Sequence, residues 1–229
     1  MLLIGSSGTG KSTALRSIIH QTLQHDPDEV RLLLIADNSA ELGAFAKLPH
    51  SLTSLMIRPV LDEYHASSAI GWAHREHHRR LDTVARASVA SIDGYNRLAR
   101  EDGHWPLPHL LIAIDDASII DANLIPEAAD ELATRVADGM HSGIYVVAAT
   151  HPDLSARLAV MFAAQIIVCF DRTPPAALAD TIPANTAAIV APGDAIVVYQ
   201  RQWRLVHIQP SDDGSIAQRV RHWASQRPH

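Results

Sequence analysis

The chain has 229 residues and a mass of 24.9 kDa, which corresponds to one large domain or two small ones. Apolar residues make up 47% and charged residues 19%, so a buried core can form, while the formal charge of −6 excludes a uniformly basic nucleic-acid coat. The single cysteine, Cys169, excludes a disulfide scaffold and is consistent with a reducing compartment, and no apolar run reaches the length of about 18 residues needed to span a membrane.

Continuous apolar runs alternate with longer amphipathic stretches along most of the chain. They predict strands at 1–4, Val30–Ala36, His109–Ile114, Ile144–Thr150 and Gln165–Phe170, and helices at Lys11–Gln24, Tyr64–Arg86, Pro126–Met140 and Leu154–Ala164. Beyond Pro174-Pro175 the runs shorten and predict small strands or hairpins at Ala187–Val190, Ala195–Gln200 and Trp203–Ile208, then a helix at Ser215–Ser225. Unbroken rather than alternating apolarity suits strands covered on both faces, so we expect an α/β fold with a mainly parallel sheet flanked by helices and small antiparallel C-terminal strands.

We expect a single domain over residues 1–229, because no linker-like or low-complexity segment divides the chain. Within it, residues 1–173 form the α/β core, residues 174–210 a β-rich C-terminal part, and residues 211–229 a terminal helix and tail. Cys169 lies in an apolar strand and is interpreted as a small core residue.

A phosphate-binding loop lies between the first strand and the first helix. Gly5-x-x-x-x-Gly10-Lys11-Ser12 matches the pattern G-x-x-x-x-G-K-[ST] in full. Glycines let successive backbone N–H groups curl around an anion, and the positive end of the helix dipole faces the same point. The predicted nucleotide-binding residues are Gly5, Ser6, Ser7, Gly8, Thr9, Gly10, Lys11, Ser12 and Thr13. The ammonium of Lys11 would neutralise the β and γ phosphates of ATP, and the hydroxyl of Ser12 would hold Mg²⁺.

A second acidic element is required beside such a loop to position Mg²⁺. The strand His109–Ile114 ends in Asp115, which we expect to act on Mg²⁺ as the Walker B aspartate does. Asp116 then stands where many such ATPases place a glutamate that activates the attacking water; alternatively, it only caps the following turn. His151, at the end of the Ile144–Thr150 strand, is either a sensor of the γ-phosphate or a hydrogen-bonded structural residue.

These motifs and their surroundings resemble the motor ATPases of the FtsK/SpoIIIE family of DNA translocases. The Walker motifs are shared by many NTPases, whereas the segment between them is more specific. The matching residues are Val30–Ile35 with Asp37, Glu41-Leu42, Phe45, Pro49-His50, Arg79-Arg80, Val89, Ile92, Gly94-Tyr95-Asn96, Pro108–Asp115, Gly143-Ile144, Ala149-Thr150, Pro192-Gly193-Asp194 and Val206-His207.

The resemblance implies a RecA-like fold, a homo-oligomeric ring that is usually hexameric, ATP hydrolysis with Mg²⁺ at subunit interfaces, and duplex DNA as the translocated partner, in the cytoplasm. The sequence also departs from the family at several positions. Asp116 replaces the usual glutamate and is one methylene shorter, so the water must shift inward or hydrolysis slows. His151 replaces a glutamine, Met140 replaces a basic residue, and Asp37-Asn38-Ser39 makes a tighter turn. Because the sequence begins almost at the phosphate loop, with no membrane anchor, preceding linker domain or winged-helix tail, we expect a bare motor core, either small by nature or a fragment of something longer.

Local basic residues would have to contact DNA phosphates, given the net negative charge. The candidates are His74, Arg75, His77, His78, Arg79 and Arg80 in one stretch and Arg219, Arg221 and Arg227 in another; each is alternatively part of a solvated helix face or tail. The spacing of His74, His77 and His78 does not favour a metal site, because no cysteine or carboxylate framework accompanies it.

Other functions remain open on sequence alone. A related motor with another cargo would be a viral genome-packaging ATPase or an ATPase module of a type VII secretion protein. A third alternative is a weakly active module in which bound nucleotide orders an assembly without being turned over.

Overall fold

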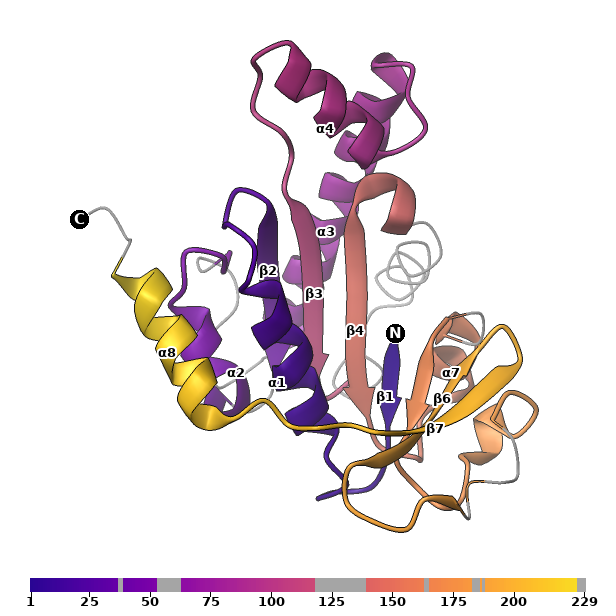
Figure 1. Ribbon diagram of the computed structural model, residues 1–229. Coiled ribbons are helices and arrows are strands. Elements are labelled where there is room, and N and C mark those ends of the chain that lie inside the picture. Colours follow the sequence, from indigo (N-terminus) through magenta and orange to yellow (C-terminus); the bar gives the residue numbers. More distant parts are fainter. Residues whose placement is uncertain are drawn as a thin grey trace.

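The computed structural model describes residues 1–36, 39–52, 63–117, 139–162, 165–182, 186 and 188–225. Within these residues, seven strands form one sheet in the order β2-β3-β4-β1-β5-β6-β7 (Figure 1). The strands are β1 Leu2–Ile4, β2 Val30–Ala36, β3 His109–Asp115, β4 Ile144–Thr150, β5 Ile167–Cys169, β6 Asp194–Tyr199 and β7 Gln202–His207. The first five strands pair in parallel, and β6 and β7 pair antiparallel. The predicted fold class is confirmed.

The C-terminal strands extend the main sheet rather than forming a separate hairpin layer, because β6 pairs with β5. The strand expected at Ala187–Val190 is wrong for its described residues. The backbone N–H of Val190 donates to the carboxylate of Asp194, and Arg172 donates to the carbonyls of Ile189 and Val190. Side chains are therefore already hydrogen-bonded to the backbone N–H and carbonyl groups that a strand would use to pair with a neighbouring strand.

Helices cover both faces of the sheet. They are α1 Lys11–Thr22, α2 Ser39–Ala46, α3 Glu63–Arg86, α4 Ile92–Glu101, α7 Ala156–Phe162 and α8 Asp213–Ala224, with a 3₁₀ turn at Ala176–Leu178. The helices predicted near α1, α3, α7 and α8 are confirmed, and α2 and α4 were not expected. The helix predicted at Pro126–Met140 lies almost entirely outside the described residues.

The core has two layers that the sheet separates. Leu15 of α1, Phe45 of α2 and Trp223 of α8 pack on one face, against the β-strand residues Leu3, Leu34 and Ala113. On the other face, α3 and α7 pack against the alternate residues of the same strands, including Leu33 and Ile112. Strand residues pointing both ways are buried, as the continuous apolar runs predict.

The strand register brings the carboxyl ends of the central strands to one edge. Asp115 at the end of β3 lies opposite Ala149 of β4, and Thr150 of β4 lies opposite Ile4 of β1. The loop from β1 to α1 therefore begins at the edge where β3 and β4 end. In Figure 1 this edge is at the bottom, and α4 lies at the opposite end of the sheet. Among the described helices, none is both long and apolar enough to cross a membrane.

Candidate nucleotide site

The loop between β1 and α1 has the backbone that its glycines predict. Gly8 and Gly10 have φ values of 79° and 108°, in the left-handed region that favours glycine. A Cβ atom at Gly5 would lie 2.6 Å from the Thr9 hydroxyl oxygen and 3.0 Å from the Cβ of Phe170, so a side chain there would collide with its neighbours. Gly10 is also the residue immediately before α1, so the first backbone N–H groups of the helix face the concave side of the loop.

Lys11 is drawn into this loop. The residue is 9% exposed, and its Nζ donates a hydrogen bond of 2.9 Å to the carbonyl oxygen of Ser6. Burial lowers the pKa of Lys11, and the carboxylates of Asp116, Asp115 and Asp171 act in the opposite direction. Burial thus disfavours the charged form of Lys11 and the three carboxylates favour it, and a phosphate bound beside its Nζ would favour the charged form in the same way.

Ser12 and Asp115 meet across the sheet edge. The Ser12 hydroxyl donates a hydrogen bond of 3.3 Å to Oδ1 of Asp115, although β4 lies between β1 and β3 in the sheet. Helix α1, which carries Ser12, packs on the sheet face in contact with β3 and β4 and spans this gap. The structure thus places side by side the two residues that sequence analysis predicted to share Mg²⁺.

Asp116 and His151 form a second pair at the same edge. They directly follow β3 and β4, and Nε2 of His151 lies 3.7 Å from Oδ2 of Asp116. Their side chains are 29% and 41% exposed, so both can reach a ligand or water in front of the loop. All four residues predicted to be catalytic, Lys11, Asp115, Asp116 and His151, therefore lie at one edge of the sheet.

Sequence analysis missed Asp171, which follows β5 on the other side of the loop. The Ser6 hydroxyl donates a hydrogen bond of 3.0 Å to Oδ2 of Asp171, and the adjacent Phe170 closes against the loop glycines. A signal for it existed, because Asp171 directly follows an apolar strand that was predicted, as Asp115 does. That signal could not show that the strand before Asp171, β5, pairs with β1 rather than with another strand.

Two of the basic residues considered for DNA contact are structural. Arg80 is 3% exposed; its Nε donates to Glu76 at 2.7 Å and its Nη1 to the carbonyl of Ser142 at 3.2 Å. His77 is fully buried, and its Nδ1 lies 2.9 Å from the Ser142 hydroxyl. Burial lowers the pKa of Arg80, an effect that Glu76 opposes. Arg80 and His77 are therefore neither accessible to DNA nor part of a solvated helix face, because both side chains are buried and hold α3 against the segment before β4.

The other candidates for DNA contact in the two basic stretches are exposed, partly exposed or outside the described residues. Arg75, His78, Arg79 and Arg221 are exposed, His74 and Arg219 are partly exposed, and Arg227 lies outside the described residues. No group of three metal-ligating side chains forms in the part of the chain that the structure describes, and the rings of His74 and His78 stack edge to face at 4.4 Å.

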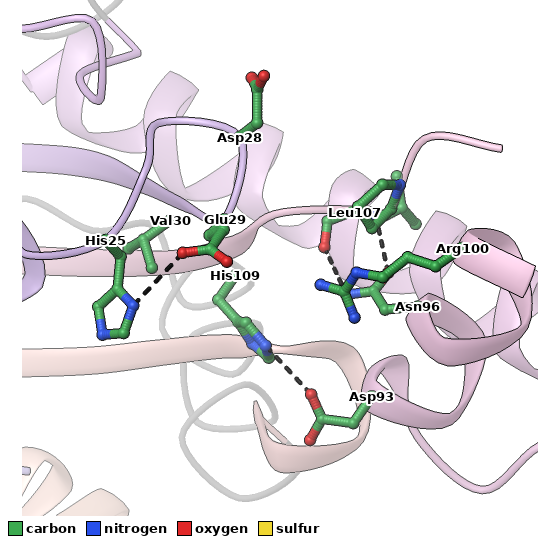
Figure 2. A pocket seen from close by; sticks show the side chains of 10 residues that line it. His25, Asp28, Glu29, Val30, Asp93, Asn96, Arg100, Leu107 and His109 are labelled. Atoms are coloured by element: carbon green, nitrogen blue, oxygen red, sulfur yellow. Dashed lines mark hydrogen bonds and ion pairs between the residues drawn. The ribbon is translucent and has the colours of Figure 1, made fainter. Parts of the chain in front are cut away.

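The Gly94-Tyr95-Asn96 segment lies in α4, at the end of the sheet opposite the phosphate loop. Figure 2 shows the Asn96 side chain bonded to the backbone of Leu107, donating to its carbonyl and accepting from its N–H, both at 2.8 Å. Nε2 of His109 lies 3.1 Å from Oδ1 of Asp93 in the same view. These contacts fix α4 and the loop before β3 around a cavity of about 310 Å³.

The fold and this edge of the sheet define a RecA-like P-loop NTPase. The model of the FtsK/SpoIIIE family matches residues 1–166, and the chain belongs to that family. This confirms the resemblance found from the motifs.

Curated relatives align over about two thirds of the chain. DNA translocase SftA of Bacillus subtilis is 32% identical over 154 residues, covering 65% of this chain and 15% of its own length. DNA translocase FtsK of Helicobacter pylori strain J99 is 28% identical over 151 residues, covering 66% of this chain and 17% of its own. The chain thus spans about a sixth of the length of these relatives.

Solved structures share the fold over nearly the whole chain. The cytoplasmic domain of the type VII secretion ATPase EccC from Thermomonospora curvata matches with a TM-score of 0.78 at 19% identity, covering 99% of this chain and 28% of that one. The pCW3 conjugation coupling protein TcpA, with ATPγS, matches with a TM-score of 0.74 at 16% identity, covering 97% and 64%. At these identities the likeness concerns the fold alone.

Proposed function

We propose that this chain is an ATP-binding and ATP-hydrolysing motor unit that moves double-stranded DNA. The observation that carries the nucleotide part is the meeting of Lys11, Ser12 and Asp115 at the mouth of the glycine loop, with the Ser12 hydroxyl 3.3 Å from Asp115. Support for DNA comes from family membership and from relatives named DNA translocases.

The donor set fits Mg²⁺. One hydroxyl and one carboxylate oxygen are hard ligands at the same point, and Mg²⁺ in proteins takes one or two such ligands and completes its shell with water and phosphate oxygens. Bound there, Mg²⁺ would neutralise charge on the β and γ phosphates. Ser12 would ligate it, and Asp115 would ligate it directly or through water.

The remaining residues act on the nucleotide itself. On binding, Lys11 would exchange its bond to the Ser6 carbonyl for a phosphate oxygen, while the loop N–H groups surround the phosphates. Asp116 would accept a proton from the attacking water. His151, beside Asp116 and directly after β4, would contact the γ-phosphate, so that the end of β4 would respond to the presence of this phosphate.

Steady-state ATPase activity with and without duplex DNA tests this function. DNA should stimulate turnover in the wild type, and Lys11→Ala should abolish both nucleotide binding and turnover because it removes the phosphate counter-charge. Lys47→Ala is the matched control, since Lys47 is the only other lysine and is exposed after α2. Unchanged ATP affinity in Lys11→Ala would overturn the site, and turnover that ignores DNA would favour another cargo.

We further propose that copies of the chain assemble into a cytoplasmic ring, hexameric as the family resemblance implies. Sedimentation velocity with and without ATPγS measures the assembly. A chain that stays monomeric with ATPγS and DNA at all accessible concentrations would contradict the ring.

A further inference from the structure

The sheet has two edges, and only one of them is covered in the part of the chain that the structure describes. At the β2 edge, the N–H of Leu32 donates to the carbonyl of His50 at 2.8 Å, and the N–H of Leu52 donates to the carbonyl of Leu32 at 2.9 Å. The opposite edge is β7, which pairs with β6 alone among the described strands (Figure 1). An uncovered strand edge is a template for the addition of a further strand.

The tight turn between β6 and β7 fixes which backbone groups of β7 face the open edge. Gln200 and Arg201 are its two central residues, and their φ values of 50° and 63° are those of a type I′ turn. Tyr199 and Gln202 flank this turn and lie opposite each other, so they form the hydrogen-bonded pair that closes the hairpin. From that pair onward, hydrogen-bonded and non-hydrogen-bonded pairs alternate along the two strands.

This alternation turns the backbone groups of three β7 residues away from β6. They are Trp203, Leu205 and His207. A bond just beyond the strand agrees with the assignment, because the N–H of Ile208 donates to the carbonyl of Gly193 at 2.8 Å, at a position where the alternation predicts a hydrogen-bonded pair. The N–H and carbonyl groups of the three residues therefore point to the open edge, within reach of an added strand.

Large apolar side chains lie along one face of β7. Trp203 lies opposite Val198, which belongs to the core layer that α3 and α7 cover, so Trp203 faces the same side of the sheet. Leu205, two residues further on, faces that side as well. Trp203 is 42% exposed and Leu205 is 47% exposed, so they extend the apolar core layer to the surface at the sheet edge.

The other face of β7 and its turn carry positive charge. Residues 200–207 contain two arginines, Arg201 and Arg204, and no carboxylate. Arg204 comes between Trp203 and Leu205 in the strand, so its exposed side chain projects from the opposite face. Neither arginine forms an ion pair with another of the described residues. An added strand would therefore meet apolar side chains on one face of the sheet and an unneutralised positive charge on the other.

We propose that β7 binds an extended, acidic segment of a partner protein, which adds to the sheet as an antiparallel strand. Backbone hydrogen bonds would hold the segment, and alternate side chains would give it specificity. Its apolar side chains would lie beside Trp203 and Leu205, and its carboxylates would lie beside Arg204. This surface is separate from the nucleotide site, so the proposal does not depend on ATP hydrolysis.

The properties of β7 argue against two other occupants. Duplex DNA would use the arginines, but it would leave the backbone edge and the exposed apolar pair without contacts. Of the two sheet edges in the described residues, a second copy of the chain could offer only its own β7, because the β2 edge is covered. Two β7 strands paired with each other close a two-fold dimer, whereas the proposed ring needs two different surfaces on each copy.

Fluorescence anisotropy with labelled peptides of alternating glutamate and valine tests strand addition on the full chain. In antiparallel pairing, the peptide residues opposite Trp203 and Leu205 exchange backbone hydrogen bonds with them and share their face, so these are the valines. Methylating the valine nitrogens should weaken binding by about tenfold or more, whereas methylating the glutamate nitrogens should change it by less than about twofold. The protein is the same in both measurements, and equal effects of the two methylations would overturn the proposal.

Arg204→Glu tests the charge preference. It should weaken binding of the glutamate–valine peptide by about fivefold and strengthen binding of a lysine–valine peptide by a similar factor. Arg97→Glu, at an exposed position of α4, is the matched control and should change neither affinity. Circular dichroism shows whether both variants fold as the wild type does.

Three results would overturn the proposal. The first is a wild-type chain that binds neither peptide, and the second is an Arg204→Glu variant that binds both peptides as the wild type does. The third is binding of duplex DNA that Arg204→Glu abolishes while the glutamate–valine peptide does not compete with it, which would assign the arginine to nucleic acid.

Discussion

The hydroxyl of Ser12 donates a hydrogen bond to the carboxylate of Asp115 at 3.3 Å, joining residues 103 positions apart in the chain. One belongs to the first turn of α1 and the other to the last residue of β3. Both side chains offer an oxygen atom that can ligate a metal ion, and Lys11 points into the loop beside them. The pair therefore defines the point at which a metal ion would join the bound phosphates to the sheet.

Replacing Asp115 tests that point directly. Asp115→Asn keeps the size of the side chain but removes its charge, so we expect Mg²⁺ to strengthen ATPγS binding much less than in the wild type. The affinity without Mg²⁺ should stay the same or rise, because a negative charge near the phosphates is lost. Isothermal titration with and without Mg²⁺ measures both values. Asp153→Asn, at an exposed position beyond His151, serves as the control.

Substitutions of Asp116 test whether its carboxylate is catalytic or only caps the turn after β3. We expect Asp116→Glu to raise kcat, because the longer side chain reaches the position that glutamate holds in many related ATPases. Asp116→Asn should lower kcat by about a hundredfold or more, as loss of a general base does, with little change in nucleotide affinity. Steady-state and single-turnover ATPase measurements distinguish these effects. An Asn variant with wild-type kcat would assign Asp116 to the turn instead.

Asp171 places a negative charge beside the phosphate loop, although the hydrogen bond that it accepts there does not require a charge. Its Oδ2 accepts the Ser6 hydroxyl at 3.0 Å, and an amide oxygen can do the same. Asp171→Asn should therefore tighten ATPγS binding by about twofold to fivefold through reduced repulsion of the phosphates. The gain should shrink in high salt, since screening weakens both charges. Asp180→Asn is an exposed comparison outside the loop, and weaker binding by Asp171→Asn would show that the carboxylate has a positive role.

The parts of the fold that could be predicted are those marked by a residue pattern within one short segment of the sequence. The strand Val30–Ala36 was predicted with its observed bounds, because an unbroken apolar run is typical of a strand covered on both faces. The meeting of Ser12 and Asp115 also follows from local patterns, since a glycine loop after one parallel strand and an acidic residue after another must lie at the same sheet edge.

The parts that were missed depend on contacts between distant segments. Helix α4 contains Gly94 and is only ten residues long, so its pattern did not stand out; the Ser91 cap and the hold of Asn96 on Leu107 stabilise it. The burial of Arg80 likewise depends on Ser142, 62 positions away, whose carbonyl accepts from its guanidinium. Composition and spacing cannot show that one of two adjacent arginines turns inward.

Arg79 and Arg80 allow that difference to be measured. Both donate to Glu76 at 2.7 Å, but the Arg79 side chain is 54% exposed and that of Arg80 is 4% exposed. Arg80→Ala should lower the free energy of unfolding by about 3 kcal/mol, because it leaves the buried Ser142 carbonyl without this donor and leaves Glu76 paired only with the exposed Arg79. Arg79→Ala should cost about 1 kcal/mol or less, as exposed ion pairs do. Urea unfolding followed by circular dichroism compares the two, and equal losses would contradict the assignment of Arg80 to the core.

Glu76 gives this cluster a dependence on pH. Burial acts to raise the pKa of Glu76, but the hydrogen bonds from Arg79 and Arg80 outweigh it and hold the pKa below the usual value of 4.5. The unfolded chain therefore takes up this proton first as the pH falls, so the stabilisation is complete above pH 4.5 and is lost as the pH drops through the lowered pKa. Glu76→Gln should be less stable than the wild type near neutral pH, and the gap should narrow in acid. Urea titrations at a series of pH values measure that gap, with the exposed Glu101→Gln as control. A gap that stays constant down to the acid limit of folding would mean that Glu76 contributes through packing and hydrogen bonding rather than through its charge.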